Sequence, residues 1–240
     1  MRAPLRPSLI ALAAALAACS TEKSSDRPAA DSAAGAAVAA DADPDRVVAG
    51  GGIPSGFTAR TDTSTRGGGR ARADVSGIRF AGNNGRIEVT TGPAHILYDA
   101  KTSASGNYTA STTIEQLEAP EHPEAFGMFV GGRGLDGPEE SYTYFVVRGG
   151  GEYLIRQRSG ATTKDVVNWT ASDAVPKQDA SGRATYRLAI RVARDSVHFL
   201  VNDRPVAAVP KGTLPTDGVA GLRVNHNLHV AATPVAITRS

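Results

Sequence analysis

The stretch Arg183–Val209, RATYRLAIRVARDSVHFLVNDRPVAAV, predicts two antiparallel strands joined by a short turn, followed by a third strand. Apolar residues occupy alternate positions, as in a strand with one buried face. A four-residue turn at Ala193–Ser196 gives the cross-strand pairs Val192 with Val197, Ile190 with Phe199, and Leu188 with Val201. Each core-facing residue then meets another, which fixes the register. Asn202–Asp203 tolerate left-handed backbone and supply the next turn. This hairpin predicts an all-β sandwich.

The N-terminus has the features of an export signal. Arg2 and Arg6 precede the apolar run Leu9–Leu16, which is too short to span a membrane as a mature helix. The following Leu16-Ala17-Ala18-Cys19 resembles the lipobox of bacterial lipoproteins. The resemblance implies that residues 1–18 are a signal peptide and that Cys19 is acylated, for example with palmitate. The alternative is a plain secretory signal ending in Ala-x-Ala, with an incidental cysteine.

Acylation would anchor the chain to a membrane of the bacterial cell envelope. Ser20 after the cysteine resembles the signal for outer-membrane sorting, so we expect a lipid-anchored outer-membrane protein. Cys19 is the only cysteine, and the fold therefore has no disulfide framework. Cleavage would remove two of the 26 basic residues and leave 24 to balance 24 acidic ones, so a nucleic-acid partner has no global electrostatic support.

Composition divides the rest of the chain in two. Residues 19–50 are rich in Ala and Asp and poor in large apolar residues, which predicts a disordered acidic tether after the lipidated cysteine. Residues 51–240 carry short alternating runs separated by Gly and Pro, which predicts a single domain. Many strands with mostly local connections favour a two-sheet antiparallel jelly roll. Ser159–Gly182 is expected to be a long loop, and Val230–Thr238 the closing strand.

Several short motifs in chain order carry a resemblance to a known fold family. They are Ile53-Pro54-Ser55-Gly56-Phe57, Gly85-Arg86-Ile87-Glu88-Val89, Gly106–Ser111, Phe126–Gly131, the pair Tyr142–Arg148 and Tyr153–Arg158, Val201-Asn202-Asp203, and Gly218–Val224. In this order they resemble the concanavalin A-like lectin/glucanase superfamily, which includes laminin-G-like domains and 3-keto-disaccharide hydrolase domains. The resemblance implies a sandwich that acts on or binds glycans, but a fold does not by itself imply a function.

The sequence identifies no catalytic residue, metal site or cofactor. Glucanases place carboxylates about 5 Å apart at alternate positions of one strand, and no strand here has that pattern. Glu118, Glu121 and Glu124 cluster in a Pro-rich segment, which favours a solvated turn. His226 and His229 are three residues apart, a spacing that sends them to opposite faces of a strand.

Tyr and Arg residues on predicted strand faces are the candidate ligand-binding residues. The hairpin register places Arg191 opposite His198 on the face away from the core. The strand pair beginning at Tyr142 adds Tyr142, Tyr144, Arg156 and Arg158. Aromatic rings suit the C–H faces of sugars, and guanidinium groups suit hydroxyls or carboxylates. Trp169, the only tryptophan, is either a stacking platform at a groove edge or a plug at the end of the sandwich.

Three functions follow as hypotheses. The first is a membrane-anchored, non-catalytic module that binds an oligo- or polysaccharide and needs an open groove with exposed Tyr or Trp. The second is a glycoside hydrolase or lyase, which needs two carboxylates, or a carboxylate and His, in one cleft. The third is an adhesion or assembly module, which needs a broad apolar patch. The sequence leaves the oligomeric state open.

Overall fold

The computed structural model describes residues 45–62 and 73–239, and within these ranges every regular element is one of fifteen strands. The predicted signal peptide, Cys19 and most of the predicted tether lie outside them. Because these residues form no helix, the described part of the chain also has no helix that could cross a membrane.

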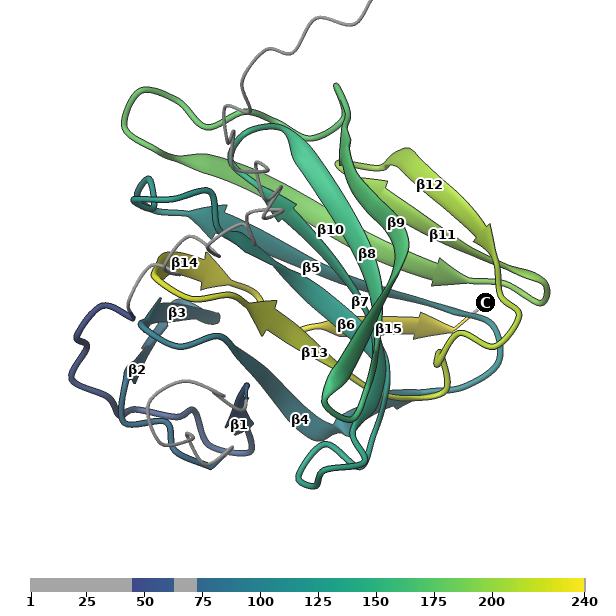
Figure 1. The fold of residues 1–240 in the computed structure, drawn as a ribbon, viewed down its shortest axis with the longest axis horizontal. Coiled ribbons are helices and arrows are strands. Elements are labelled where there is room, and N and C mark those ends of the chain that lie inside the picture. Colours follow the sequence, from purple (N-terminus) through teal and green to yellow (C-terminus); the bar gives the residue numbers. More distant parts are fainter. Residues whose placement is uncertain (1–44, 63–72, 240) are drawn as a thin grey trace, which may run out of the picture. The chain divides into compact units, whose positions relative to one another are not determined.

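The strands form two sheets (Figure 1). The seven-stranded sheet has the order β1 (Thr58–Thr61), β4 (His95–Ala104), β13 (Gly218–Val224), β6 (Ala125–Arg133), β7 (Ser141–Arg148), β8 (Glu152–Ser159) and β9 (Thr162–Ala171). The eight-stranded sheet has the order β12 (Arg204–Pro210), β11 (Ser196–Val201), β10 (Ala184–Val192), β5 (Tyr108–Gln116), β14 (Leu228–Ala232), β3 (Arg86–Thr91) and β2 (Ile78–Asn83), and β15 (Ala236–Arg239) also pairs with β5. Neighbouring strands are antiparallel throughout both sheets.

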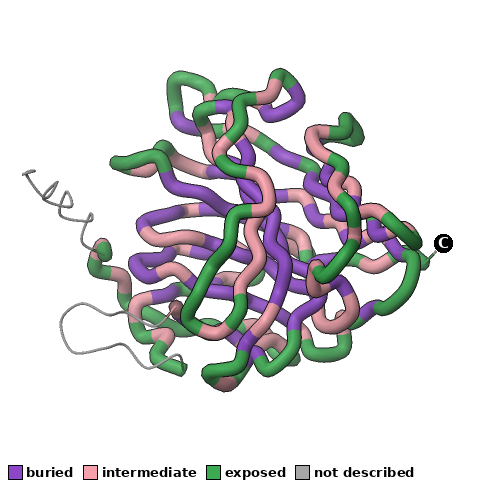
Figure 2. The backbone as a smooth tube through the Cα atoms, turned by 45° about the vertical axis from the view of Figure 1, so that its right-hand side comes forward, coloured by how far each residue is buried: buried purple, intermediate pink, exposed green. Residues whose placement is uncertain are grey.

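The main core lies between the two sheets. Phe145 and Ile155 of the seven-stranded sheet belong to the same buried cluster as Tyr186 and Phe199 of the eight-stranded one. Figure 2 shows buried stretches running along the inner strands, with exposed stretches at turns and along edge strands such as β9. The prediction of an all-β, two-sheet antiparallel sandwich is confirmed.

The predicted hairpin is confirmed residue by residue. β10 and β11 pair Leu188 with Val201, Ile190 with Phe199, and Val192 with Val197. Asn202 and Asp203 have φ of 51° and 64°, so both adopt the left-handed conformation that a two-residue turn into β12 requires. The Asn202 side chain also accepts a hydrogen bond from the Arg187 N–H at 2.9 Å, which closes the end of the hairpin.

Two strand predictions were wrong. Ser159–Gly182 is not a long loop, because β9 occupies Thr162–Ala171 and forms the edge of the seven-stranded sheet. The predicted closing strand Val230–Thr238 is divided into β14 and β15. Pro234 lies in the break and has no N–H to donate to a ladder, and the two pieces pair with successive parts of β5.

Residues 45–50 fall within the segment 19–50 that the sequence predicts to be a tether, yet Arg46 is bound to the domain. Its backbone N–H donates to Asn227 Oδ1 at 2.7 Å, and its guanidinium contacts Glu118 at 2.7 Å and the Leu228 carbonyl at 3.1 Å. The contacts of the domain therefore include Arg46.

Candidate functional site

The structure places the sequence-predicted ligand residues on two different sheets. Tyr142 and Tyr144 lie on β7, opposite Arg158 and Arg156 of β8, and Trp169 lies on β9. These strands belong to the seven-stranded sheet. Arg191 and His198 face each other on β10 and β11 of the eight-stranded sheet. The candidate residues thus form two separate groups.

A second buried cluster covers the face of the seven-stranded sheet that points away from the main core. Its members all come from this sheet and its loops: Ile96, Tyr98, Ala125, Phe129, Leu135, Tyr142, Tyr144, Val146 and Leu154, with Trp169 and Val219 packed against them. We call this surface the outer face. Tyr142 is 0% exposed and Tyr144 is 6% exposed, so neither ring has an open face for stacking.

Tyr142 is packed tightly in this outer face. Its ring centroid lies 5.0 Å from that of Phe129 and 5.8 Å from that of Tyr144. The Tyr142 hydroxyl is buried and has no hydrogen-bond partner in the described part of the chain. Burial raises the pKa of this hydroxyl, because the phenolate would lose its hydration. Tyr142 therefore acts as a packing residue here.

Buried ion pairs lie beside these tyrosines. Arg223 donates from Nη1 and Nη2 to the two carboxylate oxygens of Asp62, both at 2.6 Å, and its guanidinium lies 5.7 Å from the Tyr144 ring centroid. Arg158 donates to Glu140 at 2.8 Å. Burial acts to lower the pKa of Arg223, but the Asp62 carboxylate acts in the opposite direction and the pKa is raised overall. These charges neutralise one another inside the face.

Trp169 and Arg148 form a more accessible group at one end of the outer face. The Arg148 guanidinium carbon lies 4.3 Å from the Trp169 ring centroid. Arg148 also contacts Glu152 Oε2, from Nε at 2.7 Å and from Nη2 at 2.6 Å. Trp169 is partly buried against Leu154 and its neighbours, so it is neither a fully exposed platform nor a buried plug.

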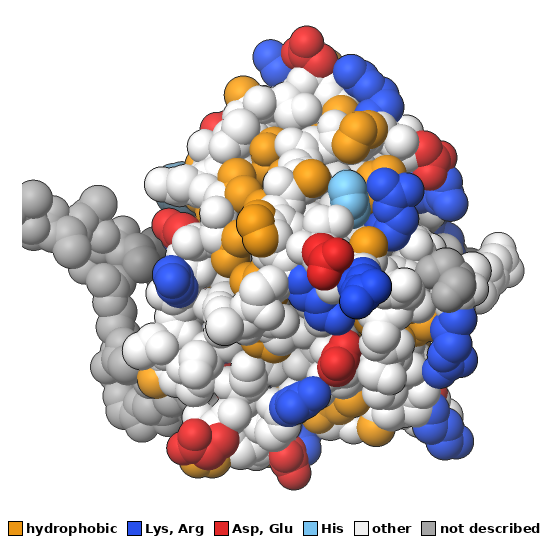
Figure 3. Space-filling view, turned by 90° about the vertical axis from the view of Figure 1, so that its right-hand side faces the viewer, with side chains coloured by type: hydrophobic (Ala, Val, Ile, Leu, Met, Phe, Trp, Pro, Cys, Tyr) orange, Lys and Arg blue, Asp and Glu red, His pale blue; other side chains and the backbone are white. Residues whose placement is uncertain are grey.

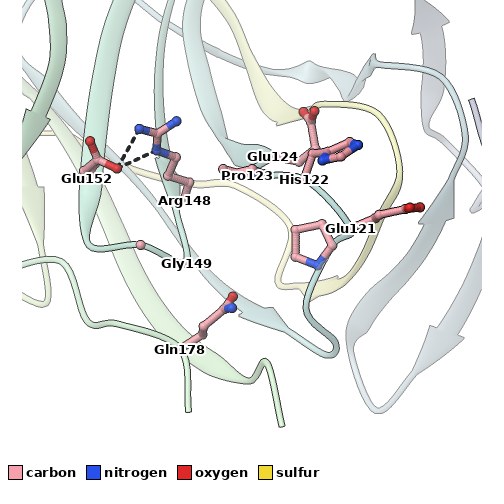
Figure 4. Close-up of a pocket in the computed structure, with 10 residues that line it drawn as sticks. Glu121, His122, Pro123, Glu124, Arg148, Gly149, Glu152 and Gln178 are labelled. Carbon is pink, nitrogen blue, oxygen red and sulfur yellow. Dashed lines mark hydrogen bonds and ion pairs between the residues drawn. The ribbon is translucent and has the colours of Figure 1, made fainter. Parts of the chain in front are cut away.

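A cleft of about 270 Å³ adjoins this group. It is lined by residues from three separate segments: Pro120, Glu121, His122, Pro123 and Glu124, then Arg148, Gly149, Gly150 and Glu152, and finally Gln178. Figure 4 shows Arg148 and Glu152 on one side of this space and His122 and Glu124 across from them, with the Glu121 side chain directed away. The turn between β7 and β8 thus forms one wall and the Pro-rich loop the other.

Both walls of the cleft are held by specific contacts. Gln178 N–H donates to the Gly149 carbonyl at 2.9 Å, and the Gln178 side-chain oxygen accepts from Gln116 at 2.5 Å. A Cβ on Gly149 would lie 2.1 Å from that same Gln178 oxygen, so a larger residue there would displace the Gln178 side chain. Across the cleft, Glu124 is only 9% exposed and lies 3.1 Å from His226 Nε2.

The Arg148–Glu152 pair presents a donor and an acceptor side by side. Among the described residues, Arg148 Nη1 and Glu152 Oε1 have no protein hydrogen-bond partner, whereas the other oxygen and two nitrogens hold the pair together. Two neighbouring hydroxyl groups match this arrangement, since one can accept from Nη1 while the other donates to Oε1. The orientation is fixed in advance by the ion pair and by Trp169.

Sequence reasoning missed Arg148, Glu152 and the Pro-rich loop as parts of one site. The solvated turn predicted for the glutamates holds for Glu121, which is exposed, but not for Glu124, which is buried. Arg148 and Glu152 flank the run Gly149-Gly150-Gly151, and this spacing across a glycine turn was the available signal.

On the other sheet, Arg191 is exposed and His198 lies 2.9 Å from the Ser196 hydroxyl. The described residues hold no group of three or more His, Cys, Asp or Glu arranged for a metal ion.

No family model and no curated protein matches the sequence. Among solved structures, a Bacillus subtilis protein of unknown function with a galectin-like fold matches at a TM-score of 0.53 and 12% identity, covering 76% of this chain and 89% of that one. The carbohydrate binding module CBM66 from Bacillus subtilis matches at a TM-score of 0.45 and 13% identity, covering 77% and 96%. The family 7 alginate lyase A1-II′ matches at a TM-score of 0.48 and 13% identity, covering 78% and 95%. At these identities the likeness concerns the fold alone, and the first match supports a galectin-like β-sandwich.

Proposed function

We propose that the domain is a non-catalytic module that binds a neutral oligosaccharide in the cleft beside Trp169. The observation that carries this proposal is the Arg148–Glu152 pair on the wall of that cleft, with the Arg148 guanidinium carbon 4.3 Å from the Trp169 ring centroid. A planar donor–acceptor pair held against an aromatic ring suits the hydroxyl edge of a sugar. Three glutamates against one arginine line the cleft, so a polyanion is disfavoured there.

The proposal extends to an anchored protein of the bacterial cell envelope. Its support is the sequence alone: the charged and apolar N-terminus, the lipobox-like Leu16–Cys19, and Ser20. The acylated Cys19 would hold the chain at the outer membrane, with the Ala- and Asp-rich segment as a tether. The sugar-binding module would then act at the envelope surface.

Replacing Cys19 by alanine is expected to move the protein from the membrane fraction to the soluble fraction of an exporting bacterium. Lipidation needs the thiol, and two or more acyl chains give stable anchoring. The measurement is immunodetection after fractionation, with Ser20→Ala as a control that keeps the cysteine. If Cys19→Ala stays in the membrane fraction after its signal peptide has been removed, as judged by its mass, the anchoring proposal is wrong.

Binding in the cleft is expected to change Trp169 fluorescence. Residues 19–240 with Cys19→Ser would be titrated with cellotetraose, xylotriose, maltotriose and chitotriose. Trp169 is the only tryptophan, so a saturable change reports directly on the Arg148 stack. Arg148→Gln and Glu152→Gln should each weaken binding about tenfold or more, since hydrogen bonds to charged groups contribute about 1.5 to 3 kcal/mol.

Calorimetry on the same variants removes any ambiguity from an altered tryptophan environment. Arg191→Gln is the matched control, because it removes an exposed arginine from the other sheet. Binding lost in Arg191→Gln but kept in Arg148→Gln would place the site on the eight-stranded sheet instead. If none of the four sugars gives a binding signal in fluorescence or in calorimetry, the cleft is refuted as a site for these glycans.

A glycoside hydrolase or lyase is the second candidate function. It is favoured by one observation: three carboxylates, Glu121, Glu124 and Glu152, line the same cleft as His122. Against it, Glu152 is held by Arg148, Glu124 is held by His226, and Glu121 is directed away. Chromatography of each oligosaccharide after long incubation tests it, and product formation abolished by Glu124→Gln would replace the binding proposal.

The assembly-module hypothesis needs a broad apolar patch. Within the described part of the chain, the exposed large hydrophobic side chains are Val47 and Ile53. Two such residues near the start of the domain do not make a broad surface. This hypothesis therefore has the least support.

A further inference from the structure

A trough runs along the side of the sandwich where the edge strands β9 and β12 approach the loop 211–217. It consists of two adjoining hollows of about 400 and 420 Å³, which share the lining residues Gln157, Lys211, Gly212, Thr213 and Leu214. Figure 3 looks onto the side that carries these strand edges in Figure 1, and shows Lys and Arg side chains interspersed with hydrophobic and acidic ones. No residue of the trough belongs to the cleft beside Trp169.

The floor of the trough is fixed by the fold. The buried Tyr108 hydroxyl donates to the Thr216 carbonyl, and Lys211 N–H donates to the Asp195 carbonyl at 3.0 Å. Gly131 has φ of 69°, and a Cβ there would lie 2.3 Å from the backbone of Pro215. These contacts hold the loop 211–217 against β5 and β6, so the hollow is preorganised.

Positive charge exceeds negative charge along the trough. Three cations line it, Arg133, Lys164 and Lys211, against two acids, Asp165 and Asp217. Both acids are already engaged: Asp165 accepts from Arg156, and Asp217 accepts from the Gly106 N–H at 3.3 Å. Lys211 Nζ is 3.9 Å from Asp217, a weak contact.

Two of the cations lack a carboxylate partner. Within the described residues, the Arg133 side chain donates only from Nε to the Asp217 backbone carbonyl at 2.9 Å, and the Lys164 side chain has no hydrogen bond or ion pair. Both are exposed. Their charged groups therefore remain free to bind an anion.

The two unpaired cations stand well apart. Arg133 pairs with Ser141, Ser141 with Ser159, and Ser159 with Thr162, two residues before Lys164. Three strand spacings put the two backbone positions about 14 Å or more apart. This spacing favours an extended ligand with repeated negative groups.

The remaining lining identifies the class of ligand. Gln157, Ser141 and Thr213 offer amide and hydroxyl groups, while Val166, Val209 and Leu214 offer small aliphatic surfaces. Such a mixture suits the hydroxyls and C–H faces of sugars. The trough has no aromatic side chain on which a nucleic-acid base could stack. We propose that this trough binds a carboxylated oligosaccharide, with Arg133 and Lys164 pairing with carboxylates of different sugar units.

The test is calorimetric titration of residues 19–240 with Cys19→Ser by trigalacturonate at low ionic strength. The double variant Arg133→Gln/Lys164→Gln should weaken binding about 100-fold, since each lost charge-assisted contact accounts for about tenfold. Arg191→Gln, which removes one exposed charge elsewhere, should leave it unchanged. Fully methyl-esterified trigalacturonate should bind at least tenfold more weakly, and added salt should weaken only the acidic sugar.

Each result decides the proposal. Equal affinity of the double variant and the parent, or absence of binding by the parent, refutes the trough as this site. Equal loss in Arg191→Gln shows non-specific charge attraction and also refutes it. Tighter binding of a polyglutamate peptide or of single-stranded DNA than of trigalacturonate overturns the sugar class. The trough does not depend on the neutral-sugar cleft, and Arg148→Gln separates the two, because it should leave trigalacturonate binding intact.

Discussion

Replacing Asp62 by alanine is expected to destabilise the domain by about 3 kcal/mol, because breaking a buried ion pair leaves an uncompensated charge. The Arg223 side chain is 8% exposed, and both of its terminal nitrogens bind Asp62. Among the described residues, the Arg223 Nε is already buried without a hydrogen-bond partner, so the loss of Asp62 would leave the whole guanidinium poorly paired. Asp62 itself is 27% exposed, which keeps the expected loss at the lower end of the range for buried pairs. Urea unfolding followed by circular dichroism measures it.

Two variants make this result specific. Arg187→Gln removes an exposed ion pair with Asp203, whose side chains are 53% and 70% exposed, and should cost less than about 1 kcal/mol. Asp62→Leu combined with Arg223→Met should recover much of the stability lost in Asp62→Ala, because it removes both charges. A loss below about 1 kcal/mol in Asp62→Ala would show that Arg223 is hydrated. The ion pair in the outer face would then be open to water.

The β10–β11 hairpin could be predicted to the residue because all of its determinants are local. Its two strands alternate strictly, and the turn between them is short. Any slip by one residue would turn Ile190 and Phe199 out of the core. The Asn202–Asp203 turn is equally local, since it depends on two residues that tolerate positive φ.

The assignment of strands to sheets could not be predicted, because it depends on distant pairings. β10 lies beside β5, which precedes it by about seventy residues in the sequence, while β8 lies beside β7 and β9. The alternation correctly placed Tyr144 and Arg191 on strand faces. It contains no information that these faces belong to different sheets.

β9 escaped prediction for a different reason. It is an edge strand whose pairing with β8 shifts register twice, and most of its residues are exposed or partly exposed. Such a strand needs no clean alternation, because neither face must be fully buried. Lys164 and Asp165 in its sequence therefore resembled a loop.

The sequence also could not show that other side chains lie over the outer face. Arg223 and Asp62 are 161 residues apart, and the cleft is assembled from segments around residues 122, 150 and 178. Strand periodicity predicts which way Tyr142 points, but not whether other side chains lie over it. For this reason the sequence favoured Tyr142 as a ligand residue where the structure shows a packed side chain.

His95 should make the domain lose stability as the pH falls from about 6.5 to 4. Its side chain is 0% exposed and its ring meets Phe80 edge-on, with centroids 5.7 Å apart. Burial, which penalises the imidazolium, lowers the pKa from 6.5 to about 4, and nearby Arg223 acts in the same direction. Between these values the unfolded chain binds a proton at His95 that the folded chain does not. The stability that the neutral His95 contributes is therefore fully present above pH 6.5 and is lost as the pH falls. The lowered pKa corresponds to about 3 kcal/mol in total.

The measurement is the free energy of unfolding in urea at pH 7.5 and at pH 4.5, for the parent, His95→Gln and His122→Gln. Ion-paired carboxylates such as Glu115 also have a lowered pKa, so every form should lose some stability in acid. The informative quantity is the difference between the parent and each variant in the free energy of unfolding that is lost from pH 7.5 to pH 4.5. The parent and His122→Gln, which changes an exposed histidine, should lose about 2 kcal/mol more than His95→Gln over this interval, because only the latter lacks the buried imidazole. Identical losses in all three would mean that His95 takes up its proton equally well in the folded and unfolded chain. The strand end at His95 would then be open to water, and the closed packing between Phe80 and the Asp62–Arg223 pair would be wrong.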